Sequence, residues 1–365
     1  MRVLIAGGGT GGHLFPAVAL AEAFRAEEPA GNILFVGTDN HLEISTLSKR
    51  GFDHVSIAAE GLKGRGIWRQ IRSLAKLPKA FWQAVRTICR FNPDMIIGVG
   101  GYSSGPVALA ARLMGKKTVI HEQNLLPGLT NRILGRFADR IFISFPDKLA
   151  MFKSYKTVVT GNPVRGEVLL AKGTERKVKG FTVLVVGGSQ GAHAINRAMA
   201  EALDYLEEPA RTSFVHQTGS KDAGWVARAY ERRGIRATVK PFFEDMASAY
   251  GLADLVICRA GATTVAELTA LGKPAIFIPY PFAANNHQEL NARYVADSGG
   301  GEVVLERDLD GELLAGRINN YASNPKALQE MSCRASALGR PEAADLIVDE
   351  CRRLLTADKC LNCLK

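Results

Sequence analysis

The stretch Val3–His13, which reads VLIAGGGTGGH, recurs in the second half of the chain as Val183–His193, VLVVGGSQGAH. Each copy starts with a short apolar run, passes through a glycine-rich turn, and leads into apolar residues spaced three to four apart. The apolar run predicts a buried strand, and the later spacing predicts a helix. The sequence therefore contains the unit of strand, glycine loop and helix twice.

Further strand-like runs follow each copy, and helical patterns separate them. They lie at residues 33–36, 95–99, 118–120 and 141–143, and again at 213–216, 255–258 and 275–278. Alternation of strands and helices predicts parallel sheets that are covered by helices on both faces. We therefore predict an α/β protein with two Rossmann-like, doubly wound domains. Such sheets bind ligands at the carboxyl ends of their strands, so we expect the site in a central cleft that the two domains face.

The expected domain limits follow from the position of the repeat. Residues 1–160 should form the first domain and residues 161–340 the second, with the seam near Thr160–Pro163. Residues 341–365 should form a C-terminal helix and tail that packs back toward the first domain. At roughly 150 residues per domain, the length of 365 residues fits two such units.

The composition is that of an ordinary globular protein, with 47% hydrophobic and 22% charged residues. It excludes disordered and collagen-like classes. Because no run of 18 apolar residues occurs, we expect no membrane span. The N-terminal residues form a short apolar run that leads into glycines, so we expect no signal peptide. The six cysteines are sparse, which favours a reducing compartment. The pair Cys360 and Cys363 could be a frayed tail with free thiols or half of a metal or redox site.

The net charge of +10 is concentrated in the first 160 residues, which hold 21 Lys+Arg against 11 Asp+Glu. Residues 61–93 contain eight cations and no acid, interleaved with apolar residues that include Trp68 and Trp82. A cationic amphipathic element with tryptophans favours an anionic membrane surface. The alternative is a packed helix with a solvated basic face. Pro78 should break or kink the helix. We do not expect nucleic-acid binding, because no recognition motif accompanies the charge.

Three interpretations of the glycine loops compete. Gly7, Gly9 and Gly12 fit the dinucleotide fingerprint G-x-G-x-x-G, with Asp39 as the ribose acid. The second loop, residues 187–191, fits the G-x-S-x-G nucleophile elbow of hydrolases. Each of these explains one loop only. A helix N-terminus that offers backbone N–H groups to a phosphate or sugar explains both.

Several further blocks carry a resemblance to a known family. They are GGGTGGHLFP (7–16), GVGGYSSG (98–105), HEQN (121–124), GNPVR (161–165), GGSQGA (187–192), RAGATTVAE (259–267) and NHQELN (286–291). These blocks resemble those of the MurG family of bacterial glycosyltransferases. They occur in the same order as in that family and extend over nearly the whole chain. The resemblance implies the GT-B fold and no cofactor. It implies inverting transfer of GlcNAc from UDP-GlcNAc to the MurNAc 4-hydroxyl of lipid I, which makes lipid II for peptidoglycan. It also implies a peripheral position at the cytoplasmic face of the inner membrane.

The resemblance also implies roles for individual residues. Inverting transfer needs a base for the acceptor hydroxyl, and both His13 and Glu122 are candidates, alone or as a relay. Ser189 and Arg165 should meet the anionic nucleotide, Glu267 the two ribose hydroxyls, and Phe243 the uracil through its main chain. The remaining expected substrate-binding residues are Thr10, Gly11, Gly12, Tyr102, Asn124, Ala262, Thr263, Thr264, Val265, Ala266, Gln288 and Asn291.

Two features qualify this assignment. An insertion at residues 281–284 shifts the alignment by about one residue, so His287 could replace Gln288 at the sugar. The D-x-D pattern Asp308–Asp310 lies away from every motif, so we interpret it as a helix cap and expect no metal. The alternative functions are a nucleotide-sugar epimerase, a dehydrogenase and a binding module without catalysis.

Overall fold

The computed structural model describes residues 1–59, 67–147, 149–173 and 180–363; the side chains of residues 67–74 and 358–363 lie outside the description. The chain divides into two compact units, Met1–Arg165 with Pro341–Lys365, and Gly166–Arg340. The boundary after Arg165 lies a few residues beyond the expected seam. The C-terminal residues 341–365 belong with the first unit.

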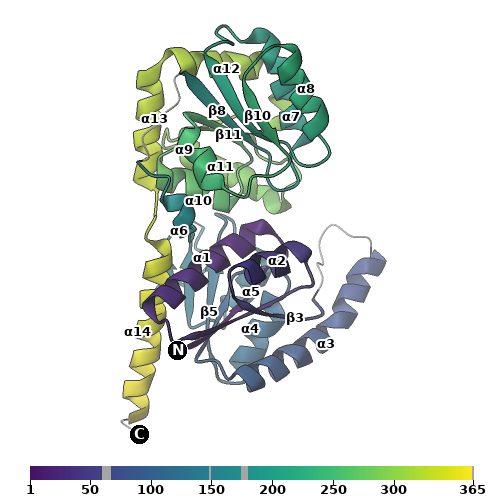
Figure 1. Cartoon of the computed structure of the whole chain (residues 1–365). Helices are drawn as coiled ribbons and strands as arrows, with labels where there is room; N and C mark the ends of the chain where they lie inside the picture. The colour runs from purple at the N-terminus through teal and green to yellow at the C-terminus, as the bar shows by residue number, and fades with distance from the viewer. Residues whose placement is uncertain (60–66, 148, 174–179, 364–365) are drawn as a thin grey trace. The chain divides into compact units, whose positions relative to one another are not determined.

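The first unit is built on a parallel sheet, which within the described residues has seven strands in the order β3-β2-β1-β4-β5-β6-β7 (Figure 1). Its elements are β1 (Arg2–Ala6), α1 (Gly11–Glu27), β2 (Asn32–Gly37), α2 (His41–Lys49), β3 (Asp53–Ser56), α3 (Ile67–Phe91), β4 (Met95–Gly98), α4 (Ser104–Leu113), β5 (Lys117–Glu122), α5 (Leu129–Leu134), β6 (Arg140–Ile143), β7 (Thr157–Val159) and α14 (Ala343–Cys363).

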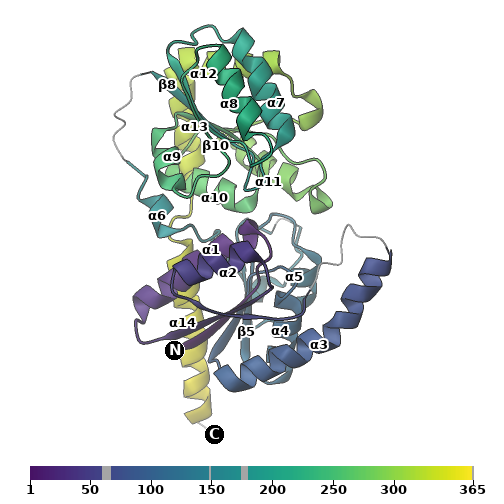
Figure 2. The ribbon, with the colours of Figure 1, turned by 45° about the vertical axis from the view of Figure 1, so that its right-hand side comes forward.

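Alternate residues of the central strand β1 point to opposite faces of this sheet, as a strand requires. Val3 and Ile5 pack in one cluster with α1 and α14, and Leu4 and Ala6 pack in another with α3 and α4. All four side chains are buried. Figures 1 and 2 show α14 beside α1, which explains why the last helix belongs with the first unit. This helix runs to Cys363, so the backbone of both Cys360 and Cys363 is helical.

Helix α3 continues through Pro78, so the proline does not break the helix there. A proline inside a helix costs about 3 kcal/mol because one hydrogen bond is lost. Packing offsets this cost, since Ala80, Ala84 and Ile88 are fully buried against the sheet. The residues Gly61–Gly66 of the predicted basic element lie outside the described part of the chain.

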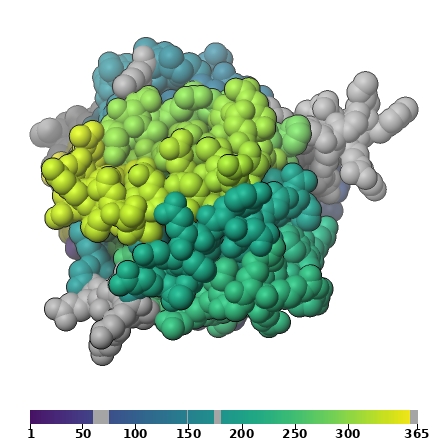
Figure 3. All heavy atoms as spheres, turned by 90° about the horizontal axis from the view of Figure 1, so that it is seen from above, coloured from purple at the N-terminus to yellow at the C-terminus, as the bar shows by residue number. Residues whose placement is uncertain are grey.

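The second unit repeats the architecture with the strand order β10-β9-β8-β11-β12-β13 in its described part, again parallel throughout. Its elements are α6 (Gly166–Leu169), β8 (Phe181–Val186), α7 (His193–Ala202), β9 (Thr212–Gln217), α8 (Ala223–Arg232), β10 (Ala237–Lys240), α9 (Met246–Leu252), β11 (Leu255–Cys258), α10 (Ala262–Leu271), β12 (Ala275–Phe277), α11 (His287–Ala296), β13 (Glu302–Val303), α12 (Gly311–Ser323) and α13 (Pro325–Leu338). Helix α12 packs against α7, and Figure 3 shows the two as yellow-green and teal atoms side by side on the surface of the second unit.

Both sheets are doubly wound, and in each the strand order reverses beside the first strand of the unit. In the first unit the reversal lies between β1 and β4, and in the second between β8 and β11. The two repeated glycine loops follow β1 and β8. Each loop therefore lies at the position where doubly wound sheets bind their ligands.

Candidate active site

Two glycine loops meet at the strand reversal of the first unit, one after β1 and one after β4. A Cβ atom on Gly7 would lie 2.4 Å from the Gly100 carbonyl oxygen, and one on Gly101 would lie 2.5 Å from the Gly8 carbonyl oxygen. Gly7, Gly100 and Gly101 also have positive φ angles, which L side chains rarely adopt. Glycine at these positions lets the two backbones touch and forms one continuous rim.

His13 lies on this rim, in the first turn of α1. A Cβ atom on Gly100 would lie 2.9 Å from the ring carbon Cε1, so the β4 loop is in contact with the imidazole. The ring nitrogen Nδ1 lies 3.1 Å from Oε1 of Gln123. Gln123 directly follows β5, so the rim and the end of β5 are connected through a side-chain hydrogen bond.

The hydrogen-bond network assigns the tautomer of His13. The Gln123 amide donates to the Val99 carbonyl at 2.7 Å and to Nδ1 of His121 at 3.1 Å, while Nε2 of His121 donates to the Gly161 carbonyl at 3.2 Å. Burial lowers the pKa of His121 to about 4, so this ring is neutral, as an accepting Nδ1 requires. Oε1 of Gln123 must then accept a hydrogen bond from Nδ1–H of His13.

The proton of neutral His13 is therefore on Nδ1, and the basic lone pair is on Nε2. An imidazole that is held in one tautomer by a fixed acceptor is suited to take a proton from a hydroxyl group. Gln123 was not among the predicted site residues, although it lies inside the HEQN block.

Glu122 has a different environment from His13. It is the last residue of β5 and is buried, and each carboxylate oxygen accepts two hydrogen bonds. The donors to Oε1 are the backbone and side-chain nitrogens of Asn124, and those to Oε2 are Gly128 N and the Asn131 amide. These bonds hold the loop between β5 and α5. Asn124 is thus a partner of Glu122, and Tyr102 on the β4 loop is exposed.

A second carboxylate, from Glu43, holds the first glycine loop. It is buried, accepts from Gly9 N at 3.1 Å and from Thr38 Oγ1 at 3.2 Å, and lies 3.3 Å from Nε2 of His54. Asp39, the expected ribose acid, is exposed. In the sequence, Asn40 followed three residues later by Glu43 is typical of a helix capping box. The pattern therefore did not indicate that Glu43 holds the first glycine loop. Thr10 is the N-cap of α1, and Gly11 and Gly12 begin the helix.

In the second unit, Gln217 connects the repeated loop to the expected base-binding segment. Its amide donates to the Gly188 carbonyl at 3.0 Å, and its Oε1 accepts from Phe243 N at 2.8 Å. The N–H of Phe243 is therefore engaged, and its carbonyl oxygen is the main-chain group left to contact a base. Ser189 is exposed on the loop and forms no hydrogen bond to any histidine in the described part, which disfavours a hydrolase triad.

Helix α10 begins after its N-cap Gly261, so the residues Ala262, Thr263 and Thr264 form its first turn. Glu267, in the second turn, is buried and accepts from the Tyr250 hydroxyl at 2.9 Å. Val265 is buried beneath the same turn, and Ala266 is half-buried. The helix thus presents an N-terminus and a carboxylate within two turns, a combination that suits a nucleotide.

The residues expected at the sugar are more varied. Gln288 accepts from Tyr280 N at 3.0 Å, and His287 Nδ1 lies 2.8 Å from the Ala284 carbonyl. Asn291 is fully buried and donates to the Ala260 carbonyl at 3.3 Å. The structure therefore gives Asn291 a role in holding the loop before α10.

Arg165 belongs to the first unit, although the expected domain limits assigned it to the second. It is buried, and its guanidinium lies 4.4 Å from the centre of the Phe15 ring on α1. A cation over an aromatic face is attracted by the ring quadrupole. Residue Phe15 follows His13 by two positions, so this contact places Arg165 beside the rim.

Among the described residues, no group of three or more His, Cys, Asp or Glu side chains could hold a metal ion. Asp310 of the D-x-D pattern is the N-cap of α12 and accepts from Leu313 N at 2.8 Å. Within the described residues, no helix combines the length and the apolar character needed to cross a bilayer.

Comparison with known proteins identifies the family. The glycosyltransferase family 28 N-terminal domain matches residues 3–143, and the family 28 C-terminal domain matches residues 182–347. A relative from Syntrophus aciditrophicus is 48% identical and covers 97% of this chain and 99% of its own. It is named UDP-N-acetylglucosamine–N-acetylmuramyl-(pentapeptide) pyrophosphoryl-undecaprenol N-acetylglucosamine transferase. The crystal structure of Acinetobacter baumannii MurG is similar, with a TM-score of 0.78, 32% identity, and coverage of 96% and 99%.

The chain belongs to the MurG family of glycosyltransferases. Its two Rossmann-like units are those of the GT-B fold, as the sequence predicted. A UDP-GlcNAc 2-epimerase from Neisseria meningitidis is also similar, with a TM-score of 0.69 at 14% identity. At that identity only the fold is shared. Membership of the MurG family therefore makes the protein a glycosyl-transferring enzyme and disfavours the epimerase alternative.

Proposed function

We propose that the protein transfers GlcNAc from UDP-GlcNAc to the 4-hydroxyl of MurNAc in lipid I, and so makes lipid II for peptidoglycan synthesis. The observation that carries this proposal is the Gln123–His13 hydrogen bond, which leaves the lone pair of the rim histidine on Nε2. The names of close relatives, which specify this donor and acceptor, support the choice of substrates.

In the proposed reaction, Nε2 of His13 takes the proton of the acceptor hydroxyl as its oxygen attacks the anomeric carbon. The bond from that carbon to the UDP oxygen breaks on the opposite face, so the configuration inverts and UDP leaves with the electron pair. Backbone N–H groups of the β8 loop and the N-terminus of α10 stabilise the departing diphosphate. Ser189 adds a hydroxyl donor. No metal is needed for these steps.

The donor is held by groups of the second unit. The carboxylate of Glu267 accepts hydrogen bonds from the ribose hydroxyls, and the hydroxyl of Tyr250 orients it. The Phe243 carbonyl meets the uracil, since its N–H is engaged by Gln217. Gln288 contacts the sugar hydroxyls. Arg165 contributes fixed positive charge toward the nucleotide, and Tyr102 and Thr10 contact the acceptor.

The roles of His13 and Glu122 can be separated by their variants. His13→Ala should reduce kcat by about 10²- to 10⁴-fold, because it removes the base. Glu122→Gln should instead lower the free energy of unfolding by about 1–3 kcal/mol, because two of the four donors then face the amide NH2 group and lose their acceptor. Transfer of radiolabel from UDP-GlcNAc to lipid I and urea unfolding measure the two effects. A His13→Ala enzyme with wild-type kcat would contradict the assignment.

We also infer that the protein is peripheral at the cytoplasmic face of the inner membrane, where the first unit contacts an anionic surface. The basic residues of 61–93 support this, as do exposed apolar side chains on α4, α5 and the turn after it. Those side chains are Leu109, Leu113, Leu129, Ile133 and Phe137. Cations and exposed apolar residues together favour a membrane interface.

This association can be tested with sedimentation. Replacing Lys76, Lys79, Arg86 and Arg90 with serine should reduce cosedimentation with anionic vesicles, because each cation near the surface contributes about 1 kcal/mol. Neutral phosphatidylcholine vesicles are the control. Equal sedimentation of wild type and variant would show that the basic face serves packing and solubility.

A further inference from the structure

Two consecutive asparagines, Asn285 and Asn286, adopt left-handed backbone conformations just before α11. Their φ angles are 56° and 54°. In the described part of the chain, only Asn92 and Ala150 share a positive φ among residues other than glycine, and both are isolated. The left-handed region disfavours L residues, although asparagine tolerates it better than most. Two such residues in succession persist only where the surrounding structure holds them, and such strain is concentrated at functional sites.

We call residues 280–286 the asparagine turn. Backbone hydrogen bonds close it, from Ala283 N to the Tyr280 carbonyl at 3.1 Å and from Asn286 N to the Ala283 carbonyl at 2.9 Å. The Asn286 side chain donates to Oε2 of Glu289 at 2.6 Å. Asn286 is the N-cap of α11, and Glu289 is the third residue of the helix. An N-cap side chain usually accepts a hydrogen bond from the first turn, so a donating N-cap indicates that Glu289 holds Asn286 in its unusual conformation.

The carboxylate of Glu289 is itself held from the next turn of the helix. Its Oε1 lies 2.8 Å from Nε and 2.7 Å from Nη2 of Arg293, four residues on. Hydrogen bonds from Asn286 and Arg293 lower the pKa of Glu289, so the carboxylate is charged at neutral pH. The series of contacts therefore runs from Arg293 through Glu289 to the left-handed Asn286.

The asparagine turn fixes Gln288, the residue assigned above to the sugar hydroxyls. Oε1 of Gln288 accepts from Tyr280 N at 3.0 Å, which connects the start of α11 to the opposite end of the turn. Because the oxygen must be the atom that faces this N–H, the position of the NH2 group, with its two donors, is fixed as well. Gln288 therefore depends on the turn for both the position and the orientation of its amide.

Hydrogen bonds connect both ends of the turn to the segment that leads into α10. Nη1 of Arg259 donates to the carbonyls of Ile278 and Pro279 at 3.0 and 3.1 Å, just before the turn. The buried amide of Asn291, after the turn, donates to the Ala260 carbonyl at 3.3 Å. Helices α10 and α11 are also in contact (Figures 1 and 2). In the proposed reaction the N-terminus of α10 stabilises the diphosphate, so the sugar attached to that diphosphate lies within reach of Gln288.

We propose that Asn286 and Glu289 are positioning residues for the sugar of the donor. The Glu289 carboxylate holds Asn286 in the left-handed region, and this conformation places the Gln288 amide against a sugar hydroxyl. The inference rests on the proposed function, because it takes the nucleotide sugar as the ligand of the second unit. It predicts a defect confined to the sugar: substitutions should weaken binding of UDP-GlcNAc and leave binding of UDP, which lacks the sugar, nearly unchanged.

Calorimetry with the full chain and no acceptor measures the Kd of both nucleotides. Asn286→Ala should raise the Kd of UDP-GlcNAc by about fivefold or more, the factor that one lost hydrogen bond corresponds to, and change that of UDP by less than about twofold. Asn286→Gly should restore most of the affinity for UDP-GlcNAc, since glycine adopts positive φ angles without strain. Unchanged binding of UDP also shows that the second unit is folded.

The matched control is Asn92→Ala in the first unit. It replaces another left-handed asparagine, with a φ of 44°, whose side chain accepts a hydrogen bond from Lys116. The loss of a left-handed asparagine and of one side-chain hydrogen bond is the same, but no residue of the donor site is attached to it. Neither Kd should change by more than about twofold.

Glu289→Ala tests whether Glu289 acts through Asn286. It should raise the Kd of UDP-GlcNAc by about threefold or more in the wild type, and by less than about twofold in the Asn286→Gly background, where no asparagine needs support. The proposal is overturned if Asn286→Ala weakens binding of both nucleotides equally, if Asn286→Gly binds UDP-GlcNAc as poorly as Asn286→Ala, or if Glu289→Ala has the same effect in both backgrounds. Transfer to lipid I is measured separately, so a wild type that binds UDP-GlcNAc without transferring the sugar contradicts the proposed function and leaves this proposal standing.

Discussion

At the scale of single residues, the amide of Gln123 connects His13 and His121 of the first unit. It donates to Val99 and His121 and accepts from His13. These roles are fixed because burial keeps His121 neutral. The position of His13 alone does not tell which of its ring nitrogens is basic. The orientation of the Gln123 amide does, because its oxygen faces Nδ1 and the lone pair is then on Nε2. A similar argument applies to Glu122, whose carboxylate is committed to the β5–α5 loop.

Gln123→Glu tests whether this hydrogen-bond network orients His13, since it keeps an acceptor for His13 but removes the donor to Val99 and His121. The new carboxylate stabilises the protonated ring, so the acidic limb of the kcat/KM pH profile should move to higher pH. We expect kcat at pH 7 to fall by about tenfold or more, with little change in the KM for UDP-GlcNAc. A profile that coincides with that of the wild type would show that Gln123 does not set the basicity of His13. Gln217→Glu, the analogous change in the second unit, is the control and should affect the donor KM instead.

At the scale of elements, the strands differ in how clearly the sequence predicts them. The central strands β1, β4, β8 and β11 read as continuous apolar runs, because both faces of a parallel sheet are covered. The outer strands β3, β7, β10 and β13 were missed. They are half-exposed, as in DHVS and ATVK, so no apolar run marks them. Their pairing partners in the sheet decide that they are strands.

The contact between the β1 and β4 loops gives a prediction for glycine substitutions. Gly101→Ala combines a positive φ of +82° with a Cβ atom 2.5 Å from the Gly8 carbonyl, so the two loops must separate. We expect it to lower the free energy of unfolding by more than about 2 kcal/mol and to reduce kcat, because the rim beside His13 shifts.

Gly115→Ala is the matched control for this change. Its φ of +69° is similar, but no atom lies within 4 Å of the added carbon. It should cost only about 1 kcal/mol and leave kcat unchanged. Thermal unfolding and the transfer assay measure both variants. Equal effects of the two substitutions would show that backbone strain, and not the contact between loops, explains the glycine.

At the scale of the whole molecule, each unit contains a buried neutral histidine. His121 lies in the first and His216 in the second, where burial lowers the pKa of His216 to about 3. His216 lies 3.0 Å from Oδ1 of Asn196 and 3.1 Å from the Tyr230 hydroxyl. The folded protein therefore resists protonation that the unfolded chain accepts readily.

Stability should consequently fall in mild acid. Both folded pKa values lie below the unfolded value near 6.5, so the contribution is complete above pH 6.5 and is lost as the pH falls toward 4. Each histidine steepens the loss by up to about 1.4 kcal/mol per pH unit. Urea unfolding at pH 7.5 and pH 5.0 measures the effect. His216→Gln should lower stability at both values but show a smaller difference between them; parallel curves would contradict this account.

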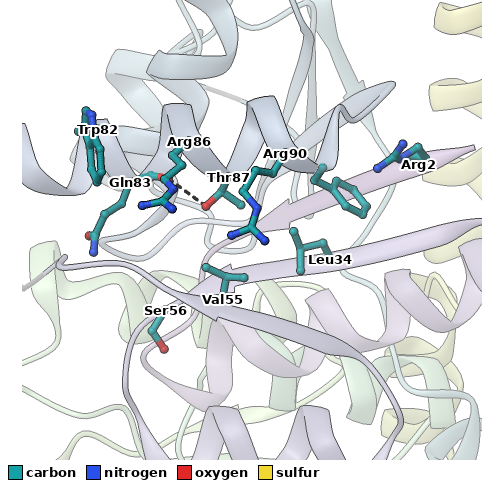
Figure 4. A pocket seen from close by; sticks show the side chains of 10 residues that line it. Arg2, Leu34, Val55, Ser56, Trp82, Gln83, Arg86, Thr87 and Arg90 are labelled. Atoms are coloured by element: carbon teal, nitrogen blue, oxygen red, sulfur yellow. Dashed lines mark hydrogen bonds between the residues drawn. The ribbon is translucent and has the colours of Figure 1, made fainter.

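Sequence alone was sufficient for the two-unit α/β architecture, the family and the positions of both glycine loops. These follow from local patterns, since buried strands must be apolar and tight turns need glycine. Only the tertiary structure decided what depends on distant partners. It showed that the carboxylates of Glu43 and Glu122 accept hydrogen bonds from loop residues, and that Gln123 is hydrogen-bonded to His13. It also showed that three arginines of β1 and α3 line one groove of the first unit (Figure 4). Such roles depend on which groups a buried or charged side chain meets, and those groups lie far apart along the chain.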